Sequence, residues 1–427
     1  MTGFTEGNFS AGLSDLSAAL TQFQNGSLWL YRLRLASDLV ASKSVSELEA
    51  DKLYASLLHD PTEDDWKLDP IEAMSFLATD HVTAMENWFD ILIRRRQYER
   101  AVQVAELIRR HRFYSTLPLG GRLLAFRHGL NAETKELDSA TARQREKFLV
   151  RNGRYKELLT GSQEIQKQLL KLPLSPEPDT DESRKQRQLL GQLSQVSSAQ
   201  EALMASYALS REPSNLAFPP QVALEDFKRL IPKGALTLSM LNTASGYHLF
   251  FVSRERIRYV KLGTTQGLNR AITKLLRDIG AIGGSSTDAE KLTSEAWRES
   301  ANEVKRGLFV DIPDESFGNV VELVVIPDGM LWYMPFEALP MTIDGREQFL
   351  VDLCPIRYAP TMYLSVEAPG GGALKRHSVA VGNMHSRGEV ETTTAEVEEL
   401  KKRFPDLHSY EKPVSYTHLT LPTILRV

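Results

Sequence analysis

The stretch that decides the fold runs Val320-Val-Glu-Leu-Val-Val-Ile-Pro-Asp-Gly-Met-Leu-Trp-Tyr-Met-Pro-Phe-Glu-Ala-Leu-Pro-Met341. Its first seven residues, 320–326, are almost uninterrupted apolar and β-branched residues, and Pro327-Asp-Gly329 stops them. This pattern predicts a strand that is buried on both faces and ends in a tight turn, as a central strand of an α/β sheet does. Residues 331–339 are amphipathic and broken by Pro335, which predicts a short helical turn packed on the sheet.

The same stretch resembles the CHAT family, a caspase-like domain that is often found behind tetratricopeptide repeats. The resemblance continues through Phe349-Leu-Val351 and Ile356-Arg-Tyr-Ala-Pro-Thr361 and covers about 223–413. It implies a bacterial-type, caspase-like cysteine peptidase that cleaves a protein substrate. In that family a histidine at the end of one strand acts as base, and a cysteine at the end of the next attacks the scissile carbonyl. Both residues lie downstream of the segment that here runs from Val379 to about Phe404.

Length and composition indicate an ordinary protein of two or three domains. The chain has 427 residues, of which 42% are hydrophobic and 25% are charged. A net charge of -4 gives no electrostatic reason to expect a nucleic-acid partner. Cys354 is the only cysteine, so no internal disulfide can form, and we expect a reducing, cytoplasmic location. Because there is neither a signal peptide nor an apolar run of ~18 residues, we expect no membrane partner.

Helical periodicity runs from Phe9 to about Leu172 and predicts a helical region over 1–172. Two units, 86–108 with a turn at Arg96-Gln97 and 148–159, each suggest a pair of helices and resemble tetratricopeptide repeats. Such repeats stack side by side, and their concave face commonly binds a peptide or a partner helix. The resemblance implies a sensor that receives a protein or peptide partner and gates cleavage. The alternative, given equal weight, is a helical domain that only packs against its neighbour.

Arginines are frequent in the second half of the helical region. They offer a lining for an acidic-peptide groove, but arginines in this pattern are more often a solvated helix face, which is the interpretation that we favour. The residues concerned are Arg94, Arg95, Arg96, Arg109, Arg110, Arg112 and Arg122.

The rest of the chain predicts a connector and an α/β domain. Residues 173–222 begin as a Pro- and acid-rich linker and continue as a connecting helix, 184–210, that offers a bridge to the sheet. Three strands with polar turns predict an antiparallel start to the CHAT-like portion, 223–413. The expected fold is α + α/β, a tetratricopeptide-like helical array before a caspase-like domain with a mostly parallel sheet. Its expected strands are 236–241, 247–252, 257–262, 320–326 and 379–382, and its helices are 269–279, 291–308 and 393–404.

In our interpretation the last residues, 414–427, are not encoded by the gene that encodes the rest of the chain. Val414-Ser-Tyr-Thr-His-Leu-Thr-Leu-Pro-Thr423 is the translation of GTC TCT TAT ACA CAT CTG ACG CTG CCG ACG, the junction of a widely used transposase-based sequencing adapter. We therefore hypothesise that 414–427 is an adapter artefact and that the gene product is truncated near Pro413. The catalytic histidine and cysteine would then be missing, the sheet incomplete and this fragment inactive.

No catalytic, cofactor-binding or metal-binding residue is therefore assigned. Cys354 lies in an apolar, strand-like run and is expected to be a buried, inert thiol. His385 is the best local candidate for a polar role, but an exposed loop residue is the favoured interpretation. Asp328 could face a substrate cleft, although the turn chemistry of Pro-Asp-Gly explains it. No phosphate loop, His-Glu-x-x-His, paired cysteines or Gly-x-Ser-x-Gly is present, so we expect no cofactor. The rival function is a non-catalytic interaction scaffold.

Overall fold

The computed structural model describes residues 8–366 with gaps at 25, 133, 135, 136, 138, 173–178, 212–214, 219–222 and 283–295. The expected strand 379–382, the expected helix 393–404, His385 and the proposed adapter tail 414–427 lie outside the described residues. Most of the expected connector 173–183 and the first residues of the expected helix 291–308 also lie outside them.

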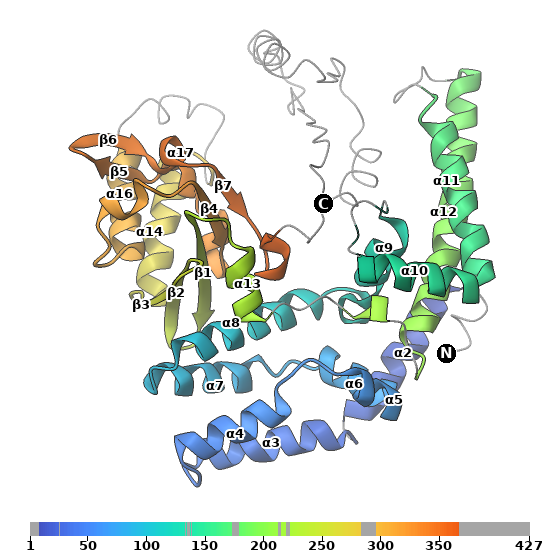
Figure 1. The fold of residues 1–427 in the computed structure, drawn as a ribbon, viewed down its shortest axis with the longest axis horizontal. Helices are drawn as coiled ribbons and strands as arrows, with labels where there is room; N and C mark the ends of the chain where they lie inside the picture. The colour runs from blue at the N-terminus through green and yellow to red at the C-terminus, as the bar shows by residue number, and fades with distance from the viewer. Residues whose placement is uncertain are drawn as a thin grey trace.

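The helical region is a succession of helices joined by short turns (Figure 1). Local sequence explains several of their ends. Ser46 and Glu49 form a reciprocal capping box, and Thr62 and Asp65 form another. The expected turn at Arg96-Gln97 is confirmed, because one helix ends at Arg94 and the next begins at Tyr98. The helices are α2 (Phe9–Gln24), α3 (Leu28–Ala41), α4 (Glu47–Leu57), α5 (Glu63–Leu68), α6 (Pro70–Ala78), α7 (Val82–Arg94), α8 (Tyr98–Tyr114), α9 (Arg122–Asn131), α10 (Ser139–Arg151), α11 (Gly153–Leu169) and α12 (Asp181–Ala208).

A five-stranded sheet follows, in the order β3-β2-β1-β4-β7. Its strands are β1 (Ala235–Thr243), β2 (Gly246–Val252), β3 (Ile257–Lys261), β4 (Glu322–Ile326) and β7 (Ile356–Tyr358). The antiparallel start is confirmed, since β1 pairs with β2 and β2 with β3 in antiparallel fashion. β4 lies between β1 and β7 and runs parallel to both. The described sheet is therefore mixed rather than mostly parallel, because the first two connections are tight hairpins and only the later ones are crossovers.

The crossover segments cover one face of this sheet. They comprise α14 (Thr265–Asp278), α16 (Ala296–Leu308), the hairpin of β5 (Pro340–Ile343) and β6 (Arg346–Phe349), and α17 (Leu350–Leu353), with short helical turns at η5 (Gly329–Tyr333) and η6 (Phe336–Ala338). Their apolar side chains share a core with Leu238, Leu249 and Val325 of the sheet. The turn expected over 331–339 is thus present and packs Leu331 and Phe336 on the sheet.

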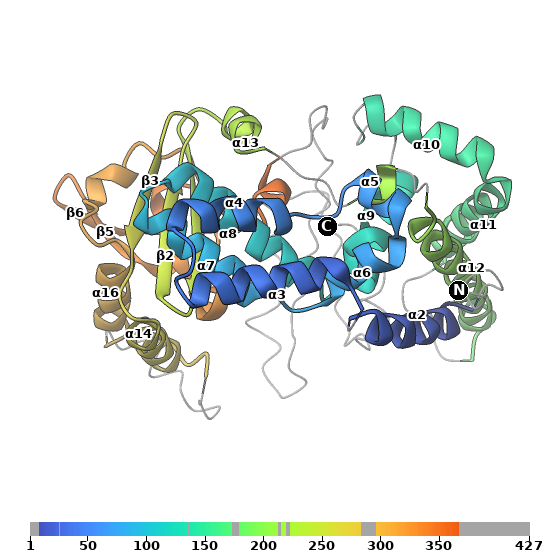
Figure 2. The ribbon, with the colours of Figure 1, turned by 90° about the horizontal axis from the view of Figure 1, so that it is seen from below.

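Helices α7 and α8 of the helical region cover the opposite face. Phe89 and Ile108 share a core with Phe250 and Ile326, which point to this side of the sheet. Figure 2 shows α7 and α8 lying across the strands. A sheet of this kind needs both faces covered to bury its apolar side chains. The second cover comes from helices more than a hundred residues earlier in the chain, so the helical region and the sheet share one core.

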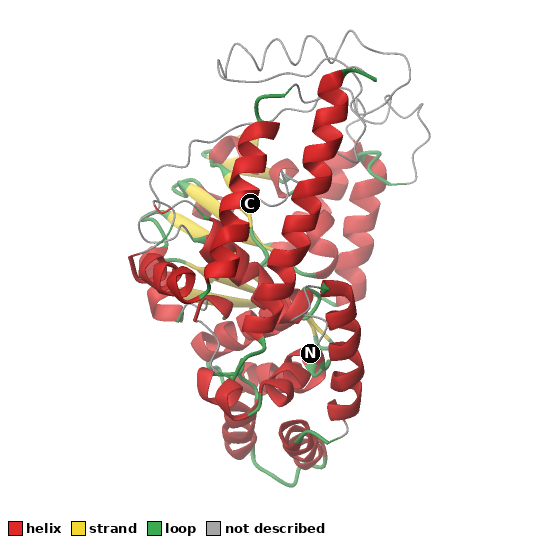
Figure 3. Cartoon of the chain, turned by 90° about the vertical axis from the view of Figure 1, so that its right-hand side faces the viewer, coloured by secondary structure: helices red, strands yellow, loops and turns green. Residues whose placement is uncertain are grey.

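A separate core holds the far end of the helical region together. Helix α12 (Asp181–Ala208) packs on α11, α2 and α9, so it belongs to this bundle rather than bridging to the sheet. The bundle stands in front of the strands in Figure 3. At its centre Arg122, 1% exposed, lies 3.6 Å from the ring centroid of Trp66 and 4.4 Å from that of Phe218. Its Nη2 donates to the carbonyl of Ala208, at the end of α12, over 2.8 Å.

Candidate functional site at the junction of helix α8 and the sheet

Helix α8 is buried on more than one side. Ala101, Val102, Val104, Ala105 and Ile108 are all buried, which leaves no single apolar stripe. A helix that is apolar around most of its circumference is enclosed by other elements. Helix α8 packs on α7 on one side and on β1, β3 and α13 (Leu224–Leu230) on others. Polar side chains of α8 are therefore carried into the junction between the helical region and the sheet.

Glu106 and Arg109, three residues apart on α8, bind the sheet directly. Arg109 donates from Nη1 to the carbonyl of Met240 and from Nη2 to Ser239 Oγ, both over 2.7 Å. Its Nη2 also lies 3.4 Å from Glu106 Oε2. Glu106 Oε1 accepts the backbone N–H of Met362 over 2.8 Å. One buried ion pair therefore joins α8 to β1 and to the turn that follows β7.

Arg112, three residues further along α8, reaches the turn after β4. Its Nη1 donates to Asp328 Oδ2 over 2.6 Å, and its Nη2 donates to the carbonyl of Asn242 over 3.1 Å and to Glu86 Oε1 over 2.6 Å. Asp328 Oδ2 also accepts the N–H of Asn242 over 2.8 Å, and Oδ1 accepts the N–H of Gly329 over 2.9 Å. The Asp328 carboxylate is thus satisfied by three donors, one of them a guanidinium from the helical region.

Gly329 is required by this turn for a steric reason. Its φ is +58°, and a Cβ added to it would lie 3.0 Å from the Tyr247 hydroxyl, which itself accepts the N–H of Met330 over 3.3 Å. Both the left-handed conformation and the close approach favour glycine. The Pro-Asp-Gly turn therefore brings Asp328 against β1 rather than out towards solvent.

The three α8 side chains Glu106, Arg109 and Arg112, which we call the α8 clamp, meet three neighbouring strands. Met362 follows β7, Met240 lies in β1 and Asp328 follows β4. These strands are mutually parallel, so their carboxyl ends lie at one edge of the sheet. In open α/β sheets, ligands and chemistry are found at that edge. The α8 clamp therefore fixes the helical region against the edge of the sheet at which these three strands end.

Burial dominates the electrostatics of the α8 clamp. Arg109 is 4% exposed and Glu106 8% exposed. Burial lowers the pKa of the Arg109 guanidinium and raises the pKa of the Glu106 carboxyl, while each partner's charge opposes the shift of the other. An arginine keeps its proton in proteins, and its positive charge favours the ionised form of the Glu106 carboxyl against the effect of burial. Among the described residues Arg109 Nε has no hydrogen-bond partner, which adds to the cost of burying this group.

Helix α7 holds the β1–β2 hairpin in a similar way. Glu86 Oε2 accepts the N–H of Ala244 over 3.0 Å, and Asp90 Oδ1 accepts the hydroxyl of Ser245 over 2.9 Å. Ser245 Oγ in turn lies 3.1 Å from Nε2 of His248, which is 1% exposed. Glu86 and Asp90 are one helical turn apart and accept hydrogen bonds from two successive residues of the hairpin. The hairpin is thus a second point where the helical region contacts the sheet.

Acid is expected to weaken the protein through His248. Its pKa is lowered to about 4 by burial and by Lys261, whereas an unfolded chain would titrate near 6.5. Tyr259, Thr243, Ser245 and Lys261 are the groups around it. Above pH 6.5 both states are neutral; as pH falls from 6.5 to 4 only the unfolded state gains the proton, so stability is lost. The loss between pH 7 and pH 5 should be about 2 kcal/mol for this group.

Urea denaturation of the wild type and of His248→Gln at the two pH values measures this effect. The difference in unfolding free energy between pH 7 and pH 5 should shrink by about 2 kcal/mol in His248→Gln. His128→Gln, which changes an exposed histidine, should leave that difference as it is in the wild type. An equal pH dependence in all three proteins would contradict the prediction.

The structure places the residues singled out from the sequence as follows. Cys354 is 3% exposed and burial raises its pKa, so its thiol is held protonated. Asp328 faces neither solvent nor an open cleft but Arg112. The interpretation of the arginines as a solvated face is wrong for Arg109, Arg110 and Arg122, which are all buried. That mistake arose because the sheet that buries Arg109 is distant in sequence.

Sequence reasoning did not identify Glu106, Glu86 or Asn242. Glu106 lies on α8 beside buried apolar residues such as Val102 and Ala105, but it is also one turn from the exposed Gln103, so the sequence carried no clear signal for its burial. Asn242 accepts the hydrogen bond from Arg112 with its backbone carbonyl, so the identity of its side chain gives no indication of this contact. Within the described residues, no group of three or more His, Cys, Asp or Glu side chains could hold a metal ion. No helix in the same part of the chain is both long and apolar enough to span a membrane.

A comparison with protein families identifies the sheet portion. Residues 290–422 match the family model of the CHAT domain. The matched residues include β4, the Asp328 turn and β7, whereas β1, β2 and β3 of the same sheet precede them. No curated protein matches the chain. The chain therefore has a helical region followed by a mixed α/β sheet, and its residues 290–422 are similar to the CHAT domain.

Proposed function

We propose that the helical region is the sensor of a caspase-like CHAT peptidase and controls it through the α8 clamp. The observation that carries this proposal is the contact of one helix with Met362, Met240 and Asp328, at or near the carboxyl ends of three parallel strands. In a caspase-like domain those ends support the catalytic loops. A partner that moved α8 would move the edge on which the peptidase depends. The single cysteine accords with a cytoplasmic location for this system.

The clamp suits this role because its bonds depend steeply on position. Hydrogen bonds of 2.6–2.8 Å weaken strongly once donor and acceptor separate by an ångström. Helix shifts of 1–2 Å are a common form of allosteric change. A shift of that size along α8 would therefore break the contacts of Glu106, Arg109 and Arg112 together, and two discrete states would result.

Replacing Arg112 by alanine is expected to loosen the sheet edge. The Asp328 carboxylate, whose side chain is 16% exposed, would lose its cationic partner, and the N–H groups of Asn242 and Gly329 would be held less tightly. Amide hydrogen exchange over 242–246 and 327–330 should become about tenfold faster, which corresponds to ~1.4 kcal/mol. Mass spectrometry of exchange in the full chain gives this readout.

Arg112→Lys is the matched control for this experiment. It keeps the charge but cannot bridge Asp328, Glu86 and Asn242 at once, so we expect a smaller acceleration than for alanine. Exchange in α11 should be unchanged in both variants. Unaltered exchange at 327–330 in Arg112→Ala would refute the coupling role of the clamp.

A second candidate function is a non-catalytic interaction scaffold, which fits this chain because its single cysteine, Cys354, is buried and is not at the position that the family resemblance implies for the nucleophile. A nucleophilic cysteine needs an exposed thiolate of lowered pKa, and Cys354 has the opposite properties. We expect no thiol-dependent cleavage of fluorescein-labelled casein by this chain, with Cys354→Ser behaving as the wild type. Cleavage that disappears in Cys354→Ser would instead assign peptidase activity to this chain.

A further inference from the structure

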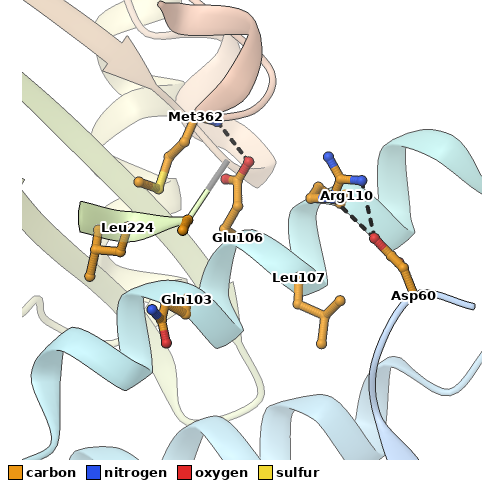
Figure 4. Close-up of a pocket in the computed structure, with 8 residues that line it drawn as sticks. Asp60, Gln103, Glu106, Leu107, Arg110, Leu224 and Met362 are labelled. Carbon is orange, nitrogen blue, oxygen red and sulfur yellow. Dashed lines mark hydrogen bonds and ion pairs between the residues drawn. The ribbon is translucent and has the colours of Figure 1, made fainter. Parts of the chain in front are cut away.

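Two adjoining cavities follow one side of helix α8. The first has a volume of about 220 Å³ and is drawn in Figure 4, and the second has a volume of about 270 Å³. Asp60, Gln103 and Leu107 line both cavities, so we treat them as one groove, the α8 groove. Gln103 is exposed and lies midway along it. The α8 groove runs beside the α8 clamp, on the same helix.

One end of the α8 groove carries an excess of positive charge. Asp51 is 3% exposed and accepts hydrogen bonds from Arg95 Nη1 over 2.6 Å and from Arg100 Nη1 over 2.5 Å. Arg100 also donates from Nη2 to Asp51 Oδ1 over 2.6 Å and from Nη1 to Gln97 Oε1 over 2.8 Å, so a single buried carboxylate serves two guanidiniums. The side chain of Arg100 is 43% exposed and lines the second cavity. At this end of the groove the guanidiniums of Arg95 and Arg100 are partly exposed to solvent, whereas the Asp51 carboxylate that they share is buried.

The other end of the α8 groove is apolar and joins both parts of the protein. Leu107 of α8, Leu224 of α13 and Met362 after β7 line the first cavity. Glu106 and Arg110 also line it, but both are engaged: Glu106 accepts the N–H of Met362, and Arg110 Nη2 lies 3.1 Å from Asp60 Oδ2 (Figure 4). What remains for an incoming group is an apolar recess. Anything that fills it touches the helical region and the CHAT portion at once.

We propose that the α8 groove is the docking site for an acidic peptide segment of a partner protein. A carboxylate of the peptide pairs with the exposed part of the Arg100 guanidinium, and one apolar side chain enters the recess formed by Leu107, Leu224 and Met362. The inference rests on the proposed role of the helical region as a sensor and names the class of partner that it senses. Occupation of the recess presses on Met362, whose N–H is held by the clamp residue Glu106.

The geometry sets the spacing of the peptide. Arg100 and Leu107 are seven residues apart on one helix, or about 10 Å at ~1.5 Å per residue. An extended peptide covers that distance in about three residues at ~3.3 Å each. The acidic and apolar side chains should therefore be three positions apart. Suitable probes are fluorescein-labelled Asp-Asp-Gly-Ser-Leu and its reverse, Leu-Ser-Gly-Asp-Asp, since the groove does not itself fix the chain direction.

Fluorescence anisotropy with the full chain tests the proposal through a pair of substitutions at Gln103. Gln103→Glu and Gln103→Lys change the charge of an exposed side chain in the middle of the α8 groove and should leave the fold unchanged. We expect roughly fivefold weaker binding of an acidic probe by Gln103→Glu and roughly fivefold tighter binding by Gln103→Lys. Gln163→Glu, the same change at an exposed position of α11, should have no effect.

Control peptides measure separately how much the acidic side chains and the apolar side chain contribute to binding. Replacing both aspartates by lysine should abolish binding, and replacing leucine by alanine should weaken it roughly tenfold. The proposal is overturned if neither acidic probe shows saturable binding up to about 1 mM, if the lysine peptide binds as well, or if Gln103→Glu binds as the wild type does.

This experiment is independent of the proposed function. If the acidic probe binds but leaves amide exchange at 327–330 unchanged, the α8 groove is confirmed as a peptide-binding site. The proposal that the helical region controls the sheet edge is then refuted. If Arg112→Ala loosens that edge but neither acidic probe binds, the coupling role of the α8 clamp is supported and an acidic peptide partner is excluded.

Discussion

Replacing Arg109 by leucine is expected to lower the free energy of unfolding by about 3–5 kcal/mol. The change leaves Glu106 as a buried carboxylate without its partner, and it removes the donors that serve Ser239 Oγ and the Met240 carbonyl. Removing one member of a buried pair costs more than the pair contributes, because the desolvated charge that remains is uncompensated. Urea denaturation monitored by tryptophan fluorescence, with hydrogen exchange in β1 as a local readout, measures the loss.

A second substitution distinguishes this cause from a simple loss of packing. Arg109→Leu combined with Glu106→Gln removes both charges but keeps an acceptor for the N–H of Met362. We expect the double variant to recover at least half of the lost stability. Arg94→Leu is the matched control, because Arg94 makes an exposed ion pair with Glu47 and should cost less than ~1 kcal/mol. A double variant as unstable as Arg109→Leu would show that packing, not charge, holds this junction.

Replacing Arg122 by alanine should cost about 3–4 kcal/mol. The Arg122 guanidinium lies over the rings of Trp66 and Phe218, which are nearly perpendicular to each other, and such cation–π contacts contribute roughly 2 kcal/mol or more when desolvated. It also donates to the carbonyl of Ala208, which lies at the end of α12 and would be left unsatisfied. Burial lowers the pKa of Arg122 to about 9, so part of the gain is offset by the cost of desolvating the charge.

Arg122→Lys tests whether the planar group matters or only the charge. An ammonium group can neither stack on an aromatic ring as a planar guanidinium does nor donate as a fork, so we expect Arg122→Lys to recover less than half of the loss. Arg143→Ala, at an exposed site on α10, should change stability by less than ~0.5 kcal/mol. Hydrogen exchange at the end of α12 should rise in Arg122→Ala. Full stability in Arg122→Lys would contradict the stacking argument.

Prediction from sequence succeeded for elements whose burial follows from the local pattern of apolar and polar residues. The run of branched apolar residues at 320–326 predicted an inner strand, and β4 (Glu322–Ile326) lies between two neighbours, although Val321 precedes the strand and is 58% exposed. The strand pairs at 236–241 and 247–252 alternate around a short polar turn and form the expected hairpin.

It failed at the candidate site because the site is made between distant segments. Arg109 and Met240 are 131 residues apart, and Arg112 and Asp328 are 216 apart. An arginine on a helix looks the same in sequence whether its guanidinium meets water or a strand's carbonyl. Asp328 similarly satisfied every requirement of a turn residue, so nothing local indicated its partner in the helical region.

The periodicity of the chain by itself determined the kinds of element and their order, because burial imposes a repeat of 3.6 on helices and of 2 on strands. The CHAT assignment came instead from the resemblance of the residues between Val320 and Thr361 to that family. Only the tertiary structure decided that α7 and α8 form the second cover of the sheet and that Glu106, Arg109 and Arg112 meet its carboxyl edge. The reason is energetic. Burying a charge is unfavourable until a specific partner is in place, and that partner exists only after the helical region and the sheet have packed together.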